Sequence, residues 1–472
     1  MMLEPETTPS DTSTPEAVIV ETIRSDGDHL LRDFIASVKQ ALIDGNGTAL
    51  RTMTEQLYVS ELAEVLTILD ADERPKLIEL IGEDFDFEAL TEVDEKIRID
   101  VLDALPLSLI AAGFVELESD DAVYILEDLP EEAQAEILRT IPTLDRLALQ
   151  RALDYPEESA GRRMQSNFIA VPPFWTVGRA IDYMREASDL PDEFHDLFVV
   201  DPGYHLLGIV KLNRMLRSKR PVTIQSIMED VQEVSAETDQ EDAAYTFQKY
   251  DLTSAAVVDK GGRLVGILTV DDIVDVVQEE AGEDMLALAG VGDEEVSDSV
   301  RAITRSRLPW LCVNLATAVL ASMVIGLFDA TLEQMVALAI LMPIVASMGG
   351  NAATQTMTVA VRAIAMHDLD PYNMGRVVLR EAYVGLVNGA AFAILMAIVA
   401  VFWFGSAGLG LVIGIAMLVN MLAAALAGIL IPIALEHFGI DPAIASSVFV
   451  TTVTDVVGFF AFLGLAALWF GI

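Results

Sequence analysis

Cysteine and histidine are scarce in this chain of 472 residues, which contains one Cys and five His. The single thiol, Cys312, lies in an apolar segment, so no disulfide can form within the chain and nothing indicates an oxidising compartment. The histidines show no zinc-ligand spacing, and we assign them no metal role. The first 300 residues also lack a catalytic Ser-His or Cys-His pattern and a phosphate-binding glycine loop. These absences argue against a membrane-anchored enzyme.

Basic residues are few as well, with 29 Lys and Arg against 73 Asp and Glu and a net charge of −44. From Arg301 onward there are six basic and eight acidic residues, a net charge of −2, which leaves −42 for the first 300 residues. So strong a negative charge repels nucleic acid and anionic lipid headgroups, and we expect neither as a partner of this part. It suits a protein that meets divalent cations, although a solvated acidic surface explains the composition equally well.

The first half of the chain shows two kinds of pattern. Residues 1–28 are rich in Glu, Thr and Pro, lack the features of a signal peptide and are predicted to be disordered. Residues 29–155 read as short amphipathic helices, in which Leu69, Leu105, Leu129 and Ile141 each open a unit. Stacked helix pairs of this kind predict an all-α superhelical domain.

A duplication follows, with βαβ patterns in residues 160–222 and again in residues 223–277. The sequence VVDPGYHLLGIVKL at 199–212 is echoed by VVDKGGRLVGILTV at 257–270. This repeat resembles a pair of CBS domains, which are regulatory α/β modules and not catalysts.

Five apolar stretches in residues 308–472 are each long enough to cross a bilayer as a helix, which needs about 20 residues. Every Arg of this part lies before the first stretch or near the loop between the second and third. By the positive-inside rule the amino terminus is cytoplasmic and the carboxyl terminus lies outside, so we expect a multi-pass protein of the cell inner membrane. The stretches are 308–328, 332–360, 382–404, 409–435 and 442–470.

Asp455 stands near the middle of the last stretch, which contains no basic residue. A carboxylate at membrane depth is costly unless water or a cation reaches it, so Asp455 is a candidate metal ligand. Hydroxyl groups recur at helical spacing before it and predict a pore-lining face. The alternative is a polar seam between packed helices. The pore-lining candidates of this stretch are Ser447, Thr451 and Thr454.

The second stretch contains Pro343 and several polar or small residues at membrane depth. Broken or polar backbone is tolerated there only where protein or a cavity satisfies it, which favours a pore-lining role. Close helix packing through glycines is the alternative. The candidates are Gly349, Gly350, Asn351 and Gln355.

Residues 272–307 are predicted to form an acidic helix that leads to the membrane. Carboxylates three and four residues apart repel each other on a helix, and a divalent cation shared with another acidic surface would turn that repulsion into a clamp. An ordinary solvated helix is the alternative. The candidate metal ligands are Asp272, Asp275, Glu279, Glu280, Glu283 and Asp284.

The order of these parts resembles the MgtE family of magnesium transporters and channels, with the sharpest matches in PIVASMGGNAATQT at 343–356 and SSVFVTTVTD at 446–455. The resemblance implies a homodimer with Asp455 of each subunit at a pore on the two-fold axis. It also implies that the acidic helix is a plug, and that cytosolic Mg²⁺ closes the pore by bridging plug, CBS pair and helical domain. Transport of another divalent cation (Co²⁺, Ni²⁺ or Mn²⁺) remains an alternative, and a CBS-controlled anion channel is a weaker one, because no Lys or Arg lies deep in a stretch.

One position of the CBS pair argues against ATP binding. Related CBS domains end their core with an acidic residue suited to a ribose, whereas Arg214 stands there in this chain. The second CBS domain keeps Thr269 and Asp272 in a Thr-x-x-Asp arrangement.

Overall fold

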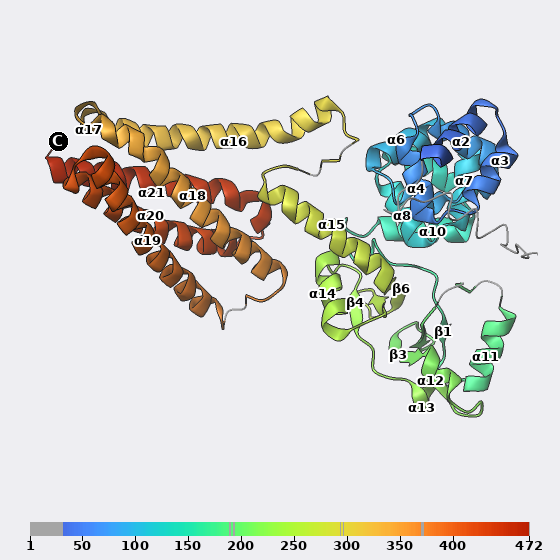
Figure 1. Ribbon diagram of the computed structural model, residues 1–472. Helices are drawn as coiled ribbons and strands as arrows, with labels where there is room; N and C mark the ends of the chain where they lie inside the picture. The colour runs from blue at the N-terminus through green and yellow to red at the C-terminus, as the bar shows by residue number, and fades with distance from the viewer. Residues whose placement is uncertain are drawn as a thin grey trace, which may run out of the picture. The chain divides into compact units, whose positions relative to one another are not determined.

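The computed structural model describes residues 32–187, 190–191, 194–292, 294–295, 297–369 and 372–471 (Figure 1). The predicted disordered tail, residues 1–28, lies outside the described residues. The chain divides into two compact units. The first runs to Val277 and includes Glu295–Ser297, and the second comprises Gln278–Glu294 and the chain from Asp298 onward.

The first unit begins with the predicted all-helical domain, built around one continuous apolar core. Three of the four residues predicted to open helical units instead end the preceding helix in extended conformation: Leu69, Leu105 and Ile141. A proline follows Leu105 and Ile141, and the residue before proline is kept out of the helical region, so the break is local in origin. All three side chains are buried. The helices are α2 Arg32–Ile43, α3 Gly47–Thr54, α4 Val59–Ile68, α5 Arg74–Ile81, η1 Gly82–Asp84, η2 Phe87–Leu90, α6 Glu95–Ala104, α7 Leu107–Glu116, α8 Ser119–Glu127, α9 Glu131–Thr140 and α10 Thr143–Leu153.

Two small sheets of the same topology follow, as the duplication predicts. In each sheet the middle strand pairs parallel with the first and antiparallel with the third. The register shifts at the same place in both copies, between Val199 and Val200 and between Val257 and Val258. The elements are β1 Ala170–Val171, α11 Val177–Glu186, β2 Asp196–Val200, β3 Leu206–Lys211, α12 Leu212–Leu216 and α13 Ile224–Ile227, then β4 Glu233–Ser235, α14 Gln240–Tyr250, β5 Ser254–Val258 and β6 Leu264–Thr269.

The two sheets share an apolar cluster that includes Phe198, Ala256 and Ile267. At its edge the buried carboxylate of Asp196 accepts a hydrogen bond of 2.7 Å from the Ser254 hydroxyl. The two CBS-like halves therefore form one body.

Helix α15, Val270–Leu288, begins in the first unit and ends in the second. The predicted acidic helix over 272–307 is thus too long. Gly290 adopts a φ of +71°, a left-handed conformation that favours glycine, and the chain returns to helix only at Val300. The acidic helix and the first membrane helix are therefore separate elements.

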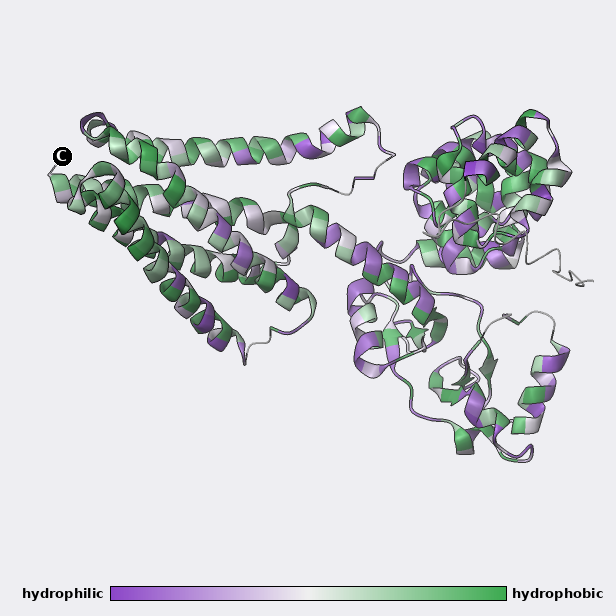
Figure 2. Cartoon of the chain, viewed as in Figure 1, coloured by the Kyte–Doolittle hydropathy of each residue, from purple (hydrophilic) through white to green (hydrophobic). Residues whose placement is uncertain are grey.

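In the described part of the second unit, five helices are long and apolar enough to cross a membrane, and Figure 2 shows hydrophobic residues along their length. Together with the helical domain and the two sheets, they confirm the predicted multidomain membrane architecture. The first and third begin eight residues before the predicted stretch, because helix continues into the charged turns outside it. The second begins four residues later than predicted, because a short separate helix precedes it. The helices are α16 Val300–Gly326, α17 Asp329–Gln334, α18 Val336–Ala365, α19 Met374–Phe404, α20 Ala407–His437 and α21 Pro442–Phe470, of which α17 is too short to span.

Helix α20 is the most deeply packed of these helices, whereas α16 buries only Ala321 among its described residues. Small residues allow the close packing of α20 on α19. A methyl group at Gly410 would lie 2.8 Å from the backbone oxygen of Ala397, so a larger side chain would push the two helices apart.

Candidate ion-binding sites

Asp455 lies thirteen residues into α21, which places it about 20 Å along the helix from Pro442. Its side chain is partly buried, and no hydrogen bond or ion pair joins it to another described residue. One turn earlier, Thr451 is exposed and its hydroxyl donates to the backbone oxygen of Ser447 over 2.8 Å. Ser447, Thr451 and Asp455 therefore share a face that reaches the surface of the membrane unit.

Thr454 is predicted on the same face, but the structure places it inside the helix bundle. Its side chain is fully buried, and its hydroxyl donates to the backbone oxygen of Thr451 over 2.9 Å. A helix advances by 100° per residue, so Thr454 and Asp455 point in different directions. Thr454 therefore packs inside the membrane unit and not on the face of Asp455.

Gly349 likewise faces the interior, where it makes room for a buried amide on α20. The side chain of Asn420 is fully buried, and its Nδ2 donates to the backbone oxygen of Val345 over 2.9 Å. A Cβ at Gly349 would lie 2.2 Å from this Nδ2, and a Cβ at Gly458 would lie 2.8 Å from it. Asn420 thus fits a notch between Gly349 of α18 and Gly458 of α21. Gly458 lies one helical turn after Asp455.

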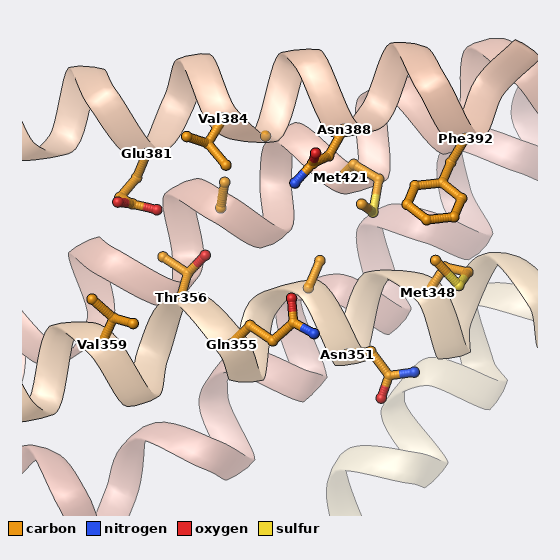
Figure 3. Close-up of a pocket in the computed structure, with 13 residues that line it drawn as sticks. Met348, Asn351, Gln355, Thr356, Val359, Glu381, Val384, Asn388, Phe392 and Met421 are labelled. Atoms are coloured by element: carbon orange, nitrogen blue, oxygen red, sulfur yellow. The ribbon is translucent and has the colours of Figure 1, made fainter.

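The remaining candidates on α18 are more open. A Cβ added at Gly350 would meet no neighbouring atom within 4 Å, and Asn351 and Gln355 are exposed to solvent or lipid. Asn351 and Gln355 line a cavity between α18, α19 and α20, shown in Figure 3. Asp455 does not line that cavity. The structure therefore divides the predicted pore-lining residues among three locations.

Acidic residues gather within the first unit, where the start of α15 approaches the helical domain. Asp272 interacts with Asp120 of α8. Burial, and then the charge of the nearby Asp275, raise the pKa of Glu92. Two hydrogen bonds join the start of α8 to the segment just before the first sheet. Gln165 Nε2 donates to Glu118 over 2.6 Å, and the backbone N–H of Ser166 donates to the Ser119 hydroxyl over 2.6 Å.

Burial and mutual repulsion disfavour ionisation of these carboxyl groups. Burial, followed by the charge of Asp272, raises the pKa of Asp120 well above its ordinary value. Burial and the neighbouring charge of Glu88 raise the pKa of Asp121 to about 8. Burial also raises the pKa of Asp272 and Asp275. One oxygen of Asp120 is buried without a hydrogen-bond partner, so a proton or a cation would stabilise the cluster.

The second half of α15 belongs to the membrane unit. Burial, and then the charge of Asp441 at the start of α21, raise the pKa of Asp284. Ala287, one turn further along α15, packs in an apolar cluster with Met357 of α18 and Val450 of α21. Glu279 and Glu283 are exposed and Glu280 is partly buried. The end of α15 therefore packs against α18 and α21, the two helices that contain the predicted pore residues.

The described residues contain no group of three or more His, Cys, Asp or Glu side chains arranged to hold a metal ion directly.

Comparison with known proteins agrees with this layout. Family models match for the MgtE intracellular N domain at residues 57–158, for CBS domains at 160–220 and 224–279, and for a divalent cation transporter, MgtE, at 342–465. The magnesium transporter MgtE of Thermus thermophilus is 31% identical over 439 residues, which cover 92% of this chain and 97% of that protein. The chain belongs to the MgtE family. This membership also confirms the resemblance found in the sequence, and it identifies the chain as a multi-pass protein of a transporter family.

Other relatives of the MgtE family extend the comparison. The magnesium transporter MgtE of Enterococcus faecalis is 35% identical over 322 residues, covering 68% of this chain and 71% of that protein. A solved structure described as the cytosolic domain of the Mg²⁺ channel MgtE in complex with ATP is 28% identical, with a TM-score of 0.48. It covers 51% of this chain and 99% of that chain.

Sequence reasoning found the α15 side of the acidic cluster but not the side on the helical domain. The residues it missed there are Glu88, Glu92, Asp120 and Asp121, and it also missed Asn420 and Asp441. In a chain with 73 acidic residues, no local signal separates a clustered carboxylate from a solvated one. Asn420 could have been singled out from the sequence, because a lone amide within an apolar stretch is unusual.

Proposed function

We propose that this member of the MgtE family transports Mg²⁺ and works as a Mg²⁺-selective channel of the cell inner membrane, with a cytoplasmic amino terminus and an outer carboxyl terminus. The observation that supports this most is Asp455, a carboxylate about halfway along a 29-residue apolar helix with no partner among the described residues. Such a group needs water or a cation within reach.

The proposed pore lies on the two-fold axis of a homodimer. Ser447, Thr451 and Asp455 share a surface face of α21, and a two-fold axis brings the same patch of both subunits together. Two carboxylates then face one ion. Because Mg²⁺ releases its waters reluctantly, the pair would hold it through water, with the hydroxyl groups as further partners.

Replacing Asp455 tests the pore. We expect Asp455→Asn to abolish Mg²⁺ flux into proteoliposomes, because an amide of the same size removes both charges from the axis. The matched control is Glu333→Gln on α17, an exposed acid outside the spans, which should transport normally. Normal flux through a folded Asp455→Asn protein would remove Asp455 from the pore.

The acidic cluster of the first unit is the proposed sensor. At high cytosolic Mg²⁺, the ion would bridge Asp272 and Asp275 of α15 with the carboxylates of the helical domain, which favours the closed pore. At low Mg²⁺ the like charges repel each other and favour an open one. The same reasoning extends to Glu279, Glu280, Glu283 and Asp284 on the second half of α15, where Asp284 lies near Asp441.

The sensor is tested by removing its charges. Substitution of Asp275, Glu280 and Glu283 by Ala should raise the Mg²⁺ concentration that inhibits the channel by about tenfold or more, because each lost charged contact costs about 1.5–3 kcal/mol. Patch recording with Mg²⁺ varied on the cytoplasmic side measures this shift. An unchanged inhibitory concentration would exclude these residues from sensing.

Two alternatives concern ligands. The wider description of the family as divalent cation transporters keeps Co²⁺, Ni²⁺ and Mn²⁺ as alternative cargo, and Mg²⁺ is favoured by the names of the relatives. For ATP, Arg214 forms an ion pair with Glu229, so the position where a ribose-binding acid is expected holds a cation that is already engaged. We propose that the CBS pair of this chain does not bind ATP through that position.

A further inference from the structure

A cavity of about 250 Å³ opens between α18 and α19 over a floor formed by α20 (Figure 3). Glu381 and Asn388 reach into it from α19, and Thr356 reaches toward them from α18. Met421 and Ala425 of α20 form part of its wall. No described side chain of α21 lines the cavity, so it is distinct from the face that contains Asp455.

The polar side chains of this cavity are incompletely satisfied. The amides of Gln355 and Asn388, like that of Asn351 at its margin, make no hydrogen bond to any described residue. Side-chain amides within a membrane span need partners, because hydrocarbon offers none. These amides are exposed at the cavity, so water or a polar ligand that enters it would supply the missing partners.

Charge and depth indicate which ligand fits. The Glu381 side chain is only 14% exposed, and the described cavity lining contains no Lys or Arg. Arg380 lies outside the lining and approaches just one carboxylate oxygen, Oε1, at 3.1 Å. Asn388 lies two turns deeper along α19, about 10 Å from Glu381. The cavity thus presents one carboxylate near the start of α19 and amide and hydroxyl oxygens deeper in the membrane. This arrangement attracts a hard cation and disfavours an anion.

Size sets the hydration state of that cation. A water molecule occupies about 30 Å³, so six waters need about 180 Å³, which the cavity can hold. One carboxylate is too few for direct octahedral coordination, and Mg²⁺ ordinarily keeps several waters. The amide and hydroxyl oxygens would then accept hydrogen bonds from the water shell.

We propose that the cavity between α18 and α19 is a second cation site, which binds a hydrated divalent cation through Glu381, Gln355, Thr356 and Asn388. The site rests on the proposed cation transport for its purpose: it would hold an ion beside the pore at the end of the membrane domain where the arginines lie. Its binding chemistry is independent of Asp455.

The chain has a single cysteine, which makes a reporter simple to build. In full-length Cys312→Ser protein, Val384→Cys places a thiol in the cavity without removing a proposed ligand, and a positively charged methanethiosulfonate reagent measures its access to water. Mg²⁺ at about ten times its dissociation constant leaves about one site in eleven open, so modification should slow about tenfold. Val387→Cys, at an exposed residue one turn away and outside the lining, should show no such protection.

Two further variants assign the protection to the site. Adding Glu381→Gln should remove it, whereas adding Asp455→Asn should leave it intact even where flux is lost, which separates this proposal from the pore. Phe392→Cys, at another lining residue without a polar group, repeats the measurement if Val384→Cys fails to fold. A thiol that never reacts indicates a cavity filled by lipid. A thiol that reacts equally with and without Mg²⁺ indicates a cavity that holds only water. Protection that survives Glu381→Gln indicates a conformational change elsewhere that closes the cavity. Each of these three results overturns the proposal.

Discussion

Gly349→Ala should destabilise the membrane unit through its contact with Asn420. The new Cβ would lie 2.2 Å from Asn420 Nδ2, whereas ordinary contacts begin near 3.4 Å, so the amide must move by about 1 Å. That movement breaks its 2.9 Å hydrogen bond to the Val345 backbone oxygen. Overpacking costs about 1–3 kcal/mol and the lost hydrogen bond about 1 kcal/mol, a total of about 2–4 kcal/mol.

Thermal unfolding in detergent, followed by size-exclusion chromatography, measures this loss. With about 2–4 °C per kcal/mol for a unit of this size, the midpoint should fall by about 4–16 °C. Gly350→Ala is the matched control, because no neighbouring atom lies within 4 Å of its Cβ position, and it should unfold like the parent.

The double variant Gly349→Ala with Asn420→Ala gives the sharper result. Removing the amide relieves the clash, so the pair should be more stable than the sum of the two single changes, with a coupling of about 1 kcal/mol or more. A Gly349→Ala protein as stable as the parent, or a strictly additive pair, would refute the notch between α18 and α21.

Two further predictions concern the first unit. Because the pKa of Asp121 is raised to about 8 from 3.8, its contribution to stability is fully present below 3.8 and is lost as the pH rises toward 8. Thermal unfolding in EDTA should therefore show falling stability over this range, with less fall in Mg²⁺ or in Asp121→Asn; a flat profile would contradict the buried cluster. Arg98→Ala should cost about 3 kcal/mol, because the buried guanidinium lies 2.6 Å from Asp128 and stacks over Tyr124, whereas Lys76→Ala removes an exposed pair and should cost under about 0.5 kcal/mol. Hydrogen exchange in α6 and α8 measures the difference, and equal protection in both variants would contradict it.

The secondary structure was predictable wherever a periodic pattern extended over a whole element. The last span, expected over 442–470, has those bounds in the structure. Errors arose where helices cross a change of environment. The acidic helix stops at Leu288 because of a backbone conformation at Gly290 that its charge pattern does not reveal.

The candidate sites were less predictable, because helix periodicity gives a face but not the neighbour of that face. Gly349 and Gly350 are adjacent and chemically identical, yet one receives Asn420 and the other has open space. The polarity of Asn351 and Gln355 predicts a place in the pore, and the structure places them beside Glu381 and Asn388 of α19.

The sequence alone determined the five spans, the duplicated CBS-like sheets, the acidic first half and the exceptional position of Asp455, because hydropathy, charge and repetition are properties of neighbours along the chain. Only the tertiary structure decided which carboxylates face Asp272, which glycines receive Asn420 and which amides surround the cavity next to Glu381. These pairings join residues tens to hundreds of positions apart, and the packing of whole helices fixes them.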